Sequence, residues 1–366
     1  MDMPLTPTVI PFSNSSEECN LEADFQYGFY TIIYSLVFIL GLPGNVSALY
    51  FLSRQSQRSR SSNIYFVNLS MVDTVFICLL PIRIYYHNNG NNWEFGDVTC
   101  RITGALFYAN IYLSISFFTF ISLDRYLAVV HPLIFLRLKS SKYPLFFTIV
   151  IWVISCAILL PLTLGGPLAN VSENSSQTSC FENFSPNSWQ GRLIPYNVCA
   201  LIFGFLVPFT VIAVVFPVMA RRVCQIRKSI HRKVALWIIG FILAVSLLCF
   251  LPYHITHLLY FLMRLKYIQH CSASNHIYKL RRITLALVSL NSCLNPLIYF
   301  IPSLSRRLNH QKTEHIKRVY SVTDDKPSRD KFTYTLTDVP SQQEMDITLK
   351  AKAEWVATPC LSQRLQ

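Results

Sequence analysis

The sequence predicts an all-α membrane protein: a bundle of seven transmembrane helices, with a short amphipathic helix after the seventh span. Of its 366 residues, 52% are hydrophobic and 14% are charged, against roughly 25% charged in an ordinary soluble domain. The apolar residues gather in seven blocks, at 29–52, 64–86, 99–130, 143–165, 193–220, 233–263 and 277–301. Each block is long enough to cross a hydrocarbon layer of about 30 Å as a helix, which takes about 20 residues.

These blocks divide the chain into three parts. Residues 1–28 are expected to form an extracellular tail, 29–301 the seven-span domain, and 302–366 a cytoplasmic tail. At the start of the last part, Leu304, Arg306, Arg307 and Leu308 favour a short amphipathic helix on the inner leaflet. Beyond it, Ser and Thr residues among acidic ones indicate a disordered segment with possible phosphorylation sites.

The charge distribution predicts the orientation in the membrane. If the N-terminus is outside, the three inner loops hold twelve Lys and Arg residues, while the N-terminal segment and the outer loops hold three. Basic residues concentrate on the cytoplasmic side of membrane proteins, so an outside N-terminus is expected. The net charge of +13 therefore indicates topology and not nucleic-acid binding, because no basic stripe interleaved with aromatic residues lies outside the spans.

Two further features fit this orientation. The first 28 residues contain no Lys, no Arg and no apolar core, so the first span is expected to act as the insertion signal. Acceptor triplets for N-glycosylation fall in segments predicted to be external, at Asn14, Asn170, Asn174 and Asn183. Similar triplets occur inside spans, at Asn45 and Asn68, so this pattern supports the topology without proving it.

Four of the eleven cysteines are predicted to face the oxidising side. A bridge between Cys100 and Cys180 would tie the second outer loop to the third span, and one between Cys19 and Cys271 would tie the N-terminal segment to the last outer loop. Spacing alone does not decide pairing. A zinc site is the alternative, but no further His or Cys stands at ligand spacing beside them.

Polar residues inside the spans indicate where function lies, because burying them in lipid is expensive. Asp73 in the second span is the main one, and Ser114, Asn291 and Asn295 are candidate neighbours from the third and seventh spans. Carboxylate, amide and hydroxyl oxygens together would form a small-cation or proton site. The alternative is a neutral, hydrogen-bonded core acid.

Two motifs then point to a family. Asp124-Arg125-Tyr126 ends the third span, and Asn295-Pro296-Leu297-Ile298-Tyr299 lies in the last one. With these motifs the chain resembles the class A, rhodopsin-like G-protein-coupled receptors over roughly residues 27–312. The hallmark positions of the seven spans would be Asn45, Asp73, Arg125, Trp152, Pro208, Pro252 and Pro296.

The resemblance implies roles for these residues. Asp73, Ser114, Asn291 and Asn295 would hold an allosteric sodium ion, with no other metal or cofactor expected. Cys100 and Cys180 would form the family's outer disulfide. Coupling to a heterotrimeric G-protein would involve Asp124, Arg125, Tyr126, Phe250, Pro252, Pro296 and Tyr299. Arrestin and a receptor kinase would act at the tail, in the plasma membrane.

The sequence also departs from the family pattern. Phe250 stands where most members have Trp, Phe216 where a Tyr is usual, and Ser246 where a core Phe is usual. The water-bridged link that a Tyr at position 216 would make to Tyr299 is therefore in doubt. No Cys follows the short helix until Cys360, which puts the usual lipid anchor in doubt as well.

The outer half of the spans indicates the ligand's charge. Phe107 stands at the binding level of the third span where amine receptors carry an Asp, so a cationic ligand is disfavoured. Arg83, Arg281 and Arg282 favour an anion, because the guanidinium fork suits phosphate and carboxylate. The alternative for such residues is extension of the charged head to the aqueous mouth of the bundle.

Several residues narrow the resemblance to the branch with nucleotide, lysophospholipid, cysteinyl-leukotriene and proton-sensing receptors. They are Phe107, Tyr108, Tyr112, His254 and the Cys19/Cys271 pair. His257 stands where nucleotide receptors generally have Lys or Arg, which favours a lysophospholipid or related lipid mediator. A nucleotide is the alternative.

External protons are a further alternative ligand. Five of the nine histidines lie in the outer half, at His87, His254, His257, His270 and His276, and an unperturbed His titrates near pH ~6.5. A channel or transporter is disfavoured because few charges lie at membrane depth. An enzyme is disfavoured because no nucleophile–base pair or metal triad stands at one depth.

Overall fold

The structure is a computed structural model that describes residues 8–10, 19–21, 23–54, 57–139, 142–164, 169–171, 178–181, 189–225 and 230–300. The chain divides into a unit of residues 1–223 and 227–304 and a second unit of 224–226 and 305–366. All contacts below belong to the first unit. The predicted short helix after the seventh span and the rest of the C-terminal tail lie outside the described residues.

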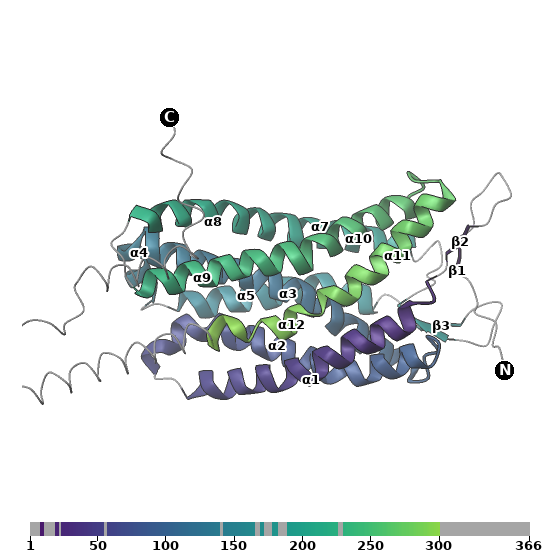
Figure 1. Ribbon diagram of the computed structural model, residues 1–366, viewed down its shortest axis with the longest axis horizontal. Helices are drawn as coiled ribbons and strands as arrows, with labels where there is room; N and C mark the ends of the chain where they lie inside the picture. The colour runs from purple at the N-terminus through teal and green to yellow at the C-terminus, as the bar shows by residue number, and fades with distance from the viewer. Residues whose placement is uncertain are drawn as a thin grey trace, which may run out of the picture. The chain divides into compact units, whose positions relative to one another are not determined.

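Seven helices in the described residues are long and apolar enough to cross a membrane, which confirms the predicted number of spans. Spans one to four contain α1 (Gln26–Ser53), α2 (Gln57–Asn88), α3 (Gly96–Val130) and α5 (Tyr143–Leu164), and α4 (Pro132–Lys139) joins the third to the fourth. Span five contains α7 (Ile194–Leu201), the π-helix η2 (Ile202–Leu206) and α8 (Val207–Gln225), preceded by the π-helix η1 (Trp189–Leu193). Span six contains α9 (Ile230–Val245), the π-helix η3 (Ser246–Phe250) and α10 (Leu251–Arg264), and span seven contains α11 (Cys271–Val288) and α12 (Asn291–Leu294). The helices run alongside one another (Figure 1).

The seventh span begins earlier than the sequence predicts, at Cys271 and not at 277. The apolar block excluded its polar first turn, and the charged residues Lys279, Arg281 and Arg282 follow soon after. Helical backbone hydrogen bonds do not depend on side-chain charge, so the helix continues through these residues. The arginines consequently lie on a regular helix inside the bundle.

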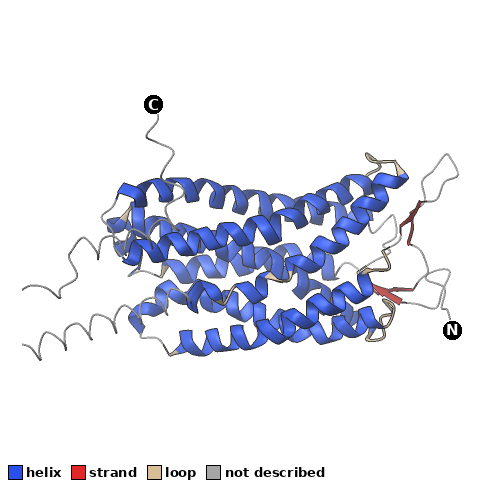
Figure 2. Cartoon of the chain, in the orientation of Figure 1, coloured by secondary structure: helices blue, strands red, loops and turns tan. Residues whose placement is uncertain are grey.

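Two short antiparallel ribbons accompany the helices. Strand β1 (Thr8–Ile10) pairs with β2 (Cys19–Leu21), and β3 (Ala169–Val171) pairs with β4 (Thr178–Cys180). Both ribbons lie at the end of the bundle where the first span begins (Figure 2); this end is predicted to be external and is called the outer end below. Strand β2 lies beside α11, and β3 and β4 lie beside α3. Each strand has three residues, so the fold remains an all-α bundle.

Prolines shape the spans where function concentrates. Pro208 and Pro252 each stand two residues after a π-helix, η2 and η3, because a proline lacks the N–H that an α-helix needs and the turn before it widens. Pro296 frees the carbonyl of Ser292 in the same way. The Asn45 amide of α1 donates to that carbonyl at 2.8 Å, which replaces the missing bond.

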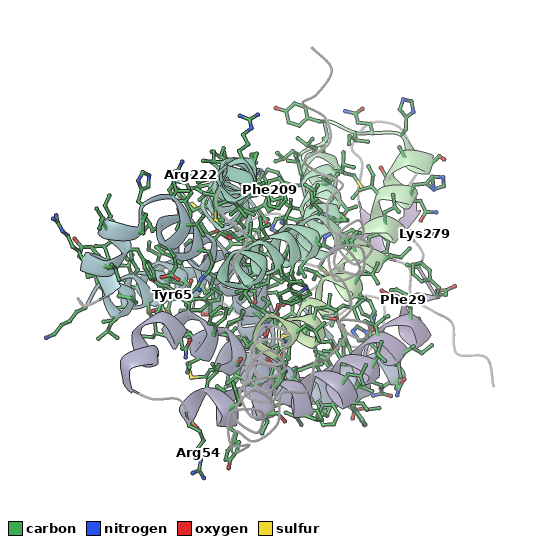
Figure 3. All side chains as sticks on the ribbon, turned by 60° about the vertical axis from the view of Figure 1, so that its left-hand side comes forward. Phe29, Arg54, Tyr65, Phe209, Arg222 and Lys279 are labelled. Atoms are coloured by element: carbon green, nitrogen blue, oxygen red, sulfur yellow. A yellow bond between two sulfur atoms is a disulfide. The ribbon has the colours of Figure 1, made fainter. Side chains whose placement is uncertain are left out.

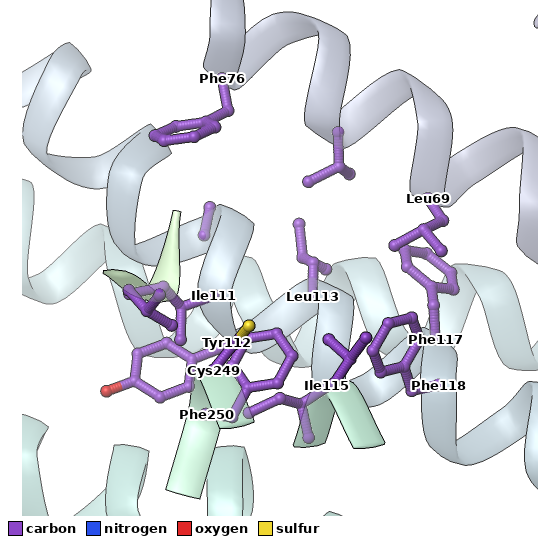
Figure 4. Packing of buried hydrophobic residues seen from close by; sticks show 14 of the residues in the cluster. Leu69, Phe76, Ile111, Tyr112, Leu113, Ile115, Phe117, Phe118, Cys249 and Phe250 are labelled. Atoms are coloured by element: carbon purple, nitrogen blue, oxygen red, sulfur yellow. The ribbon is translucent and has the colours of Figure 1, made fainter. Parts of the chain in front are cut away.

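The core fills the centre of the bundle with aromatic and branched side chains. Phe118 of α3 packs edge-to-face on Phe250 of η3, with ring centroids 6.0 Å apart (Figure 4). Tyr112 packs against Gly204 so closely that a Cβ there would lie 2.5 Å from the ring. By contrast, Arg54 at the inner end of α1 is exposed and points away from the helices (Figure 3).

Candidate ligand site and signalling motifs

Arg281 is the centre of the candidate ligand site at the outer end of the bundle. Its guanidinium carbon lies 4.2 Å from the ring centroid of Tyr260. It is close enough to Tyr108 of α3 and Tyr253 of α10 to interact electrostatically with both. Its Nε is buried with no hydrogen-bond partner. The side chain thus presents a charged donor in a mainly aromatic setting.

Below Arg281 lies a cluster of buried polar side chains from spans three, five and six. The Tyr196 and Tyr253 side chains are buried, and the hydroxyl of each interacts with the Tyr112 hydroxyl. The three tyrosines therefore form one polar cluster inside the bundle.

Two histidines of α10 extend this cluster. His254 Nδ1 lies 2.8 Å from the carbonyl oxygen of Phe250, and His257 Nε2 lies 2.9 Å from the amide oxygen of Asn197. Both oxygens only accept, so these ring nitrogens carry the protons. The other nitrogens, His254 Nε2 and His257 Nδ1, are buried without partners. On neutral rings they are acceptors that a ligand's hydroxyl or N–H group would fill.

The other two predicted arginines lie near Tyr34 of α1. Arg83 of α2 lies over the Phe107 ring at 4.7 Å. Arg282 donates to the Tyr278 hydroxyl at 2.7 Å, and both guanidinium groups interact electrostatically with Tyr34. Neighbouring residues of a helix point about 100° apart, yet Arg281 and Arg282 still interact electrostatically. The three arginines therefore belong to one region of positive charge.

Acidic partners do not neutralise the key guanidinium groups. Neither Arg83 nor Arg281 forms an ion pair with a carboxylate among the described residues; the ion pairs there include Arg101–Asp97, at 2.5 Å. A charge kept at the edge of the membrane without a counter-ion is costly. The arrangement favours an anionic ligand over a cationic one.

Asp73 is completely buried and accepts three hydrogen bonds. Its Oδ1 accepts from Asn110 Nδ2 at 2.8 Å and from Ser292 Oγ at 2.7 Å, and its Oδ2 accepts from Asn295 Nδ2 at 2.7 Å. The sequence prediction included Asn295 but missed Asn110 and Ser292. Each missed residue stands four positions before a recognised one, Ser114 or Pro296, on the same helical face.

The other two predicted sodium ligands do not hydrogen-bond to Asp73. Ser114 Oγ is buried without a partner, and Asn291 donates to the Val288 carbonyl. The Asn295 side-chain oxygen is also buried without a partner. The Asn295 oxygen belongs to the amide that donates to Asp73, and an amide oxygen beside a carboxylate fits a small hard cation, which takes oxygen ligands.

The motif at the inner end of the third span forms a local ion pair. Arg125 Nη2 lies 2.6 Å from Asp124 Oδ2, while Arg125 Nε is buried without a partner. The Tyr126 hydroxyl oxygen lies 3.4 Å from His131 Nε2. Among the described residues, Asp124 is therefore the ion-pair partner that holds the guanidinium.

Tyr299 of the seventh span points to the second span. Its hydroxyl lies 2.5 Å from Ser70 Oγ, and its ring packs edge-to-face on Phe66. Tyr299 and Arg125 thus have separate partners in this structure. An inward movement of Tyr299 would have to break the Ser70 bond.

The disulfide between Cys100 and Cys180 is present, with an S–S distance of 2.09 Å, and confirms that predicted bridge. Cys271 is also disulfide-bonded. Strand β2 begins at Cys19 and lies beside α11, which agrees with the predicted second bridge, but the Cys19 side chain lies outside the described residues. No group of three or more His, Cys, Asp or Glu that could hold a metal occurs in the part described.

The remaining predicted features are spread over the outer end. Asn170 lies in β3, whereas Asn14, Asn174 and Asn183 lie outside the described residues. His87 is buried and stacks on Tyr30 with ring centroids 4.3 Å apart. His270 and His276 do not join the cluster around Arg281: both are exposed.

Tyr196, Asn197 and Tyr253 join the candidate site although the sequence analysis did not select them. Tyr253 directly precedes His254, which the sequence analysis did select. Adjacent residues of a helix point in different directions, so the sequence alone does not show that both side chains face inward. Tyr196 and Asn197 lie on α7, where the sequence offers no motif. Their contribution follows only from how spans five and six pack.

The described residues thus form seven spans, with a candidate ligand site around Arg281 and the Asp124-Arg125-Tyr126 motif at the end of the third span. The family described as "7 transmembrane receptor (rhodopsin family)" matches residues 44–299. Lysophosphatidic acid receptor 6 from Gallus gallus is 33% identical over 79% of this chain and 94% of its own length. Cysteinyl leukotriene receptor 2 from Homo sapiens is 34% identical over 79% of this chain and 82% of its own length. The uracil nucleotide/cysteinyl leukotriene receptor from Homo sapiens is 32% identical over 78% of this chain and 76% of its own length.

The chain belongs to the rhodopsin family of G-protein-coupled receptors, in the branch that holds the purinergic and lysophospholipid receptors. It is a multi-pass membrane protein and a receptor, not an enzyme.

Proposed function

We propose that this chain is a plasma-membrane receptor for an extracellular anionic ligand, most simply a lysophospholipid or related lipid mediator. The observation that carries the proposal is Arg281, a charged side chain set among aromatic rings without a carboxylate partner among the described residues. Arg83 repeats this arrangement over Phe107. The similarity to lysophosphatidic acid receptors supports the same class. The basic inner loops support an outside N-terminus.

A nucleotide is the second candidate, and a specific observation favours it. His254 Nε2 and His257 Nδ1, which are buried without a hydrogen-bond partner and lie on rings that pack against Tyr253, form a polar end to the site. A nucleoside carries hydroxyl and amine groups that would satisfy them, whereas methylene groups against unpaired polar atoms would be unfavourable. A lipid headgroup that points inward would satisfy them equally well.

The proposed mechanism is a population shift. The anion binds best when spans six and seven close around Arg281, so binding enriches that state. Asp73, Ser114 and Asn295 would hold a sodium ion in the unbound receptor, where its charge would offset that of the buried carboxylate. Arg125 then leaves Asp124, Tyr299 leaves Ser70, and the inner face opens to a heterotrimeric G-protein. A receptor kinase and arrestin would act at the C-terminal tail.

The test is G-protein activation in cells that express the chain, beside cells that do not. The challenge is a parallel panel of lysophospholipids, nucleotides, cysteinyl leukotrienes and a pH series from about 8 to 6, across the ordinary His titration. A dose-dependent response to a lysophospholipid supports the proposal, and a response to nucleotides alone selects the second candidate. A response to pH alone would refute both and support proton sensing.

A further inference from the structure

Two threonines join spans six and seven inside the outer half of the bundle. Thr256 of α10 and Thr284 of α11 are both buried, and their hydroxyl oxygens lie 2.7 Å apart. This distance is typical of an O–H···O hydrogen bond. Because the two residues belong to different spans, the bond connects one span to the other.

Each of the two hydroxyls also has a backbone acceptor in its own helix. Thr256 Oγ1 lies 3.0 Å from the carbonyl oxygen of Tyr253. Thr284 Oγ1 lies 3.0 Å from the carbonyl oxygen of Leu280 and 3.2 Å from that of Arg281. A hydroxyl has one proton, so one proton makes the bond between the spans and the other is donated to a helix carbonyl. If the spans separate, both protons can be donated to helix carbonyls, so the bond between the spans breaks and re-forms without leaving a buried donor unsatisfied.

The threonine bond lies about one helical turn below the contact that Arg281 makes with span six. On α11, Arg281 stands three positions outside Thr284, and on α10, Tyr260 stands four positions outside Thr256. Residues three and four apart share one face of a helix. The Arg281 guanidinium carbon lies 4.2 Å from the Tyr260 ring centroid. The two contacts therefore belong to one seam between the spans.

Span one also holds this turn of span seven. The Tyr30 hydroxyl of α1 donates to the Arg282 carbonyl at 2.9 Å, and this bond is buried. Arg282 directly follows Arg281, so the turn that carries both arginines is bonded to span one. The threonine bond then acts on the distance between this turn and span six.

We propose that Thr256 and Thr284 are positioning residues for ligand binding: their bond holds spans six and seven at the separation at which Arg281 lies against Tyr260. Neither threonine contacts the ligand, and both act through Arg281. The effect on ligand affinity rests on the proposed function. The effect on the position of residue 281 does not, because it is a property of the receptor alone.

The position of residue 281 is tested first without a ligand. In an Arg281→Cys background, a small membrane-impermeant methanethiosulfonate reagent labels the new thiol on intact cells, and the unsubstituted chain is the blank. Thr256→Val removes the hydroxyl and keeps the branched shape, so the seam opens more often and the labelling rate should rise about fivefold, the equilibrium effect of one net hydrogen bond. Thr256→Ser keeps the hydroxyl and should label at the original rate. An unchanged rate in Thr256→Val would overturn the proposal.

Affinity is then measured with labelled lysophosphatidic acid on chains that keep Arg281. Thr256→Val and Thr284→Val should each weaken binding about fivefold, and the double variant should bind no more weakly than the weaker single variant, because both changes remove one bond. Thr210→Val is the matched control, since this exposed threonine of span five donates to the Leu206 carbonyl at 2.7 Å; it should keep full affinity. Unchanged affinity in the single variants, or effects that multiply in the double variant, would overturn the proposal.

The link to Arg281 is tested by combining changes. In an Arg281→Gln background, Thr256→Val should weaken binding no further, because the charge that the threonine bond positions is gone. Thr256→Ser should bind like the unsubstituted chain. A general loosening of the bundle would instead lower affinity by the same factor with and without Arg281, and that result would overturn the proposal. If the unsubstituted chain binds no lysophosphatidic acid, the proposed lipid function fails, and the labelling rates still decide whether the threonine bond positions residue 281.

Discussion

Replacing Asp73 by Asn removes one charge from the buried site with almost no change of shape. The new side-chain oxygen can still accept from Asn110 and Ser292, which lie 2.8 and 2.7 Å from Oδ1. The new NH₂ group would face the Asn295 donor, but Asn295 can turn its amide, because its oxygen is buried and has no partner. The hydrogen-bonded network therefore survives the substitution.

The magnitude follows from the contacts. Three hydrogen bonds change from charged to neutral, and each weakens by about 1 kcal/mol, which is partly offset because no charge is buried any longer. Without sodium, the fold should lose no more than about 2 kcal/mol. Sodium at ten times its Kd stabilises the unsubstituted receptor by about 1.4 kcal/mol. This corresponds to an increase in Tm of about 3–6 °C.

The assay is thermal unfolding of the purified receptor in sodium and in choline chloride at equal ionic strength. The unsubstituted chain should show the sodium-dependent increase in Tm, and Asp73→Asn should show none. Ser114→Ala should reduce it, because Ser114 Oγ is a free oxygen. Ser289→Ala is the matched control, since that hydroxyl is already bonded to the Ala286 carbonyl at 2.6 Å. A full sodium effect in Asp73→Asn would refute the cation site.

Asn45→Ala should lower the Tm in detergent, because it leaves the Ser292 carbonyl without a donor at a cost of about 1–3 kcal/mol; an unchanged Tm would contradict the role assigned to Asn45. Tyr299→Phe removes the bond to Ser70 and should raise basal G-protein activation, since that bond holds the tyrosine away from the third span; basal activity at the unsubstituted level would count against this. Cys180→Ser should reduce surface expression and ligand response together, because the disulfide anchors β4; a normal response would show that the hydrogen bonds of β4 suffice.

The fold was predictable because membrane burial dominates the sequence. Apolar blocks of at least about 20 residues leave few structures other than spanning helices, and the positions of Asp124, Arg125 and the Pro296 motif order them. The start of the seventh span was not predictable from hydropathy. Its charged first turns are compensated by aromatic contacts such as Arg281 on Tyr260, which depend on tertiary packing.

The candidate site was predictable in its residue types but not in its geometry. Arg83, Arg281 and Arg282 were selected as anion-binding residues, but the packing of each against its own aromatic ring, Phe107, Tyr260 or Tyr278, was not predicted. Likewise, Asp73 was recognised while its partners Asn110 and Ser292 were not. In both cases helical phase and the rotation of each span decide which side chains meet, and a single sequence contains little information on that rotation.

The position of Phe181 shows that the packing of a loop residue against a span was not predictable from the sequence either. The sequence predicts that Cys180 ties the second outer loop to the third span. It does not predict that the next residue turns left-handed and rests on Gly104. That contact requires a disulfide, a strand and a glycine from separate parts of the chain.

The most direct test of the central claim is agonist potency after removal of one guanidinium charge. Arg281→Gln keeps a long polar side chain, and Lys279→Gln on the same helix is the matched control for net charge. With the strongest agonist of the panel, Arg281→Gln should reduce potency about tenfold or more at unchanged surface expression, the loss expected for one charged hydrogen bond. Lys279→Gln should leave potency nearly unchanged. Equal potency of Arg281→Gln and the unsubstituted receptor would contradict anion recognition at Arg281.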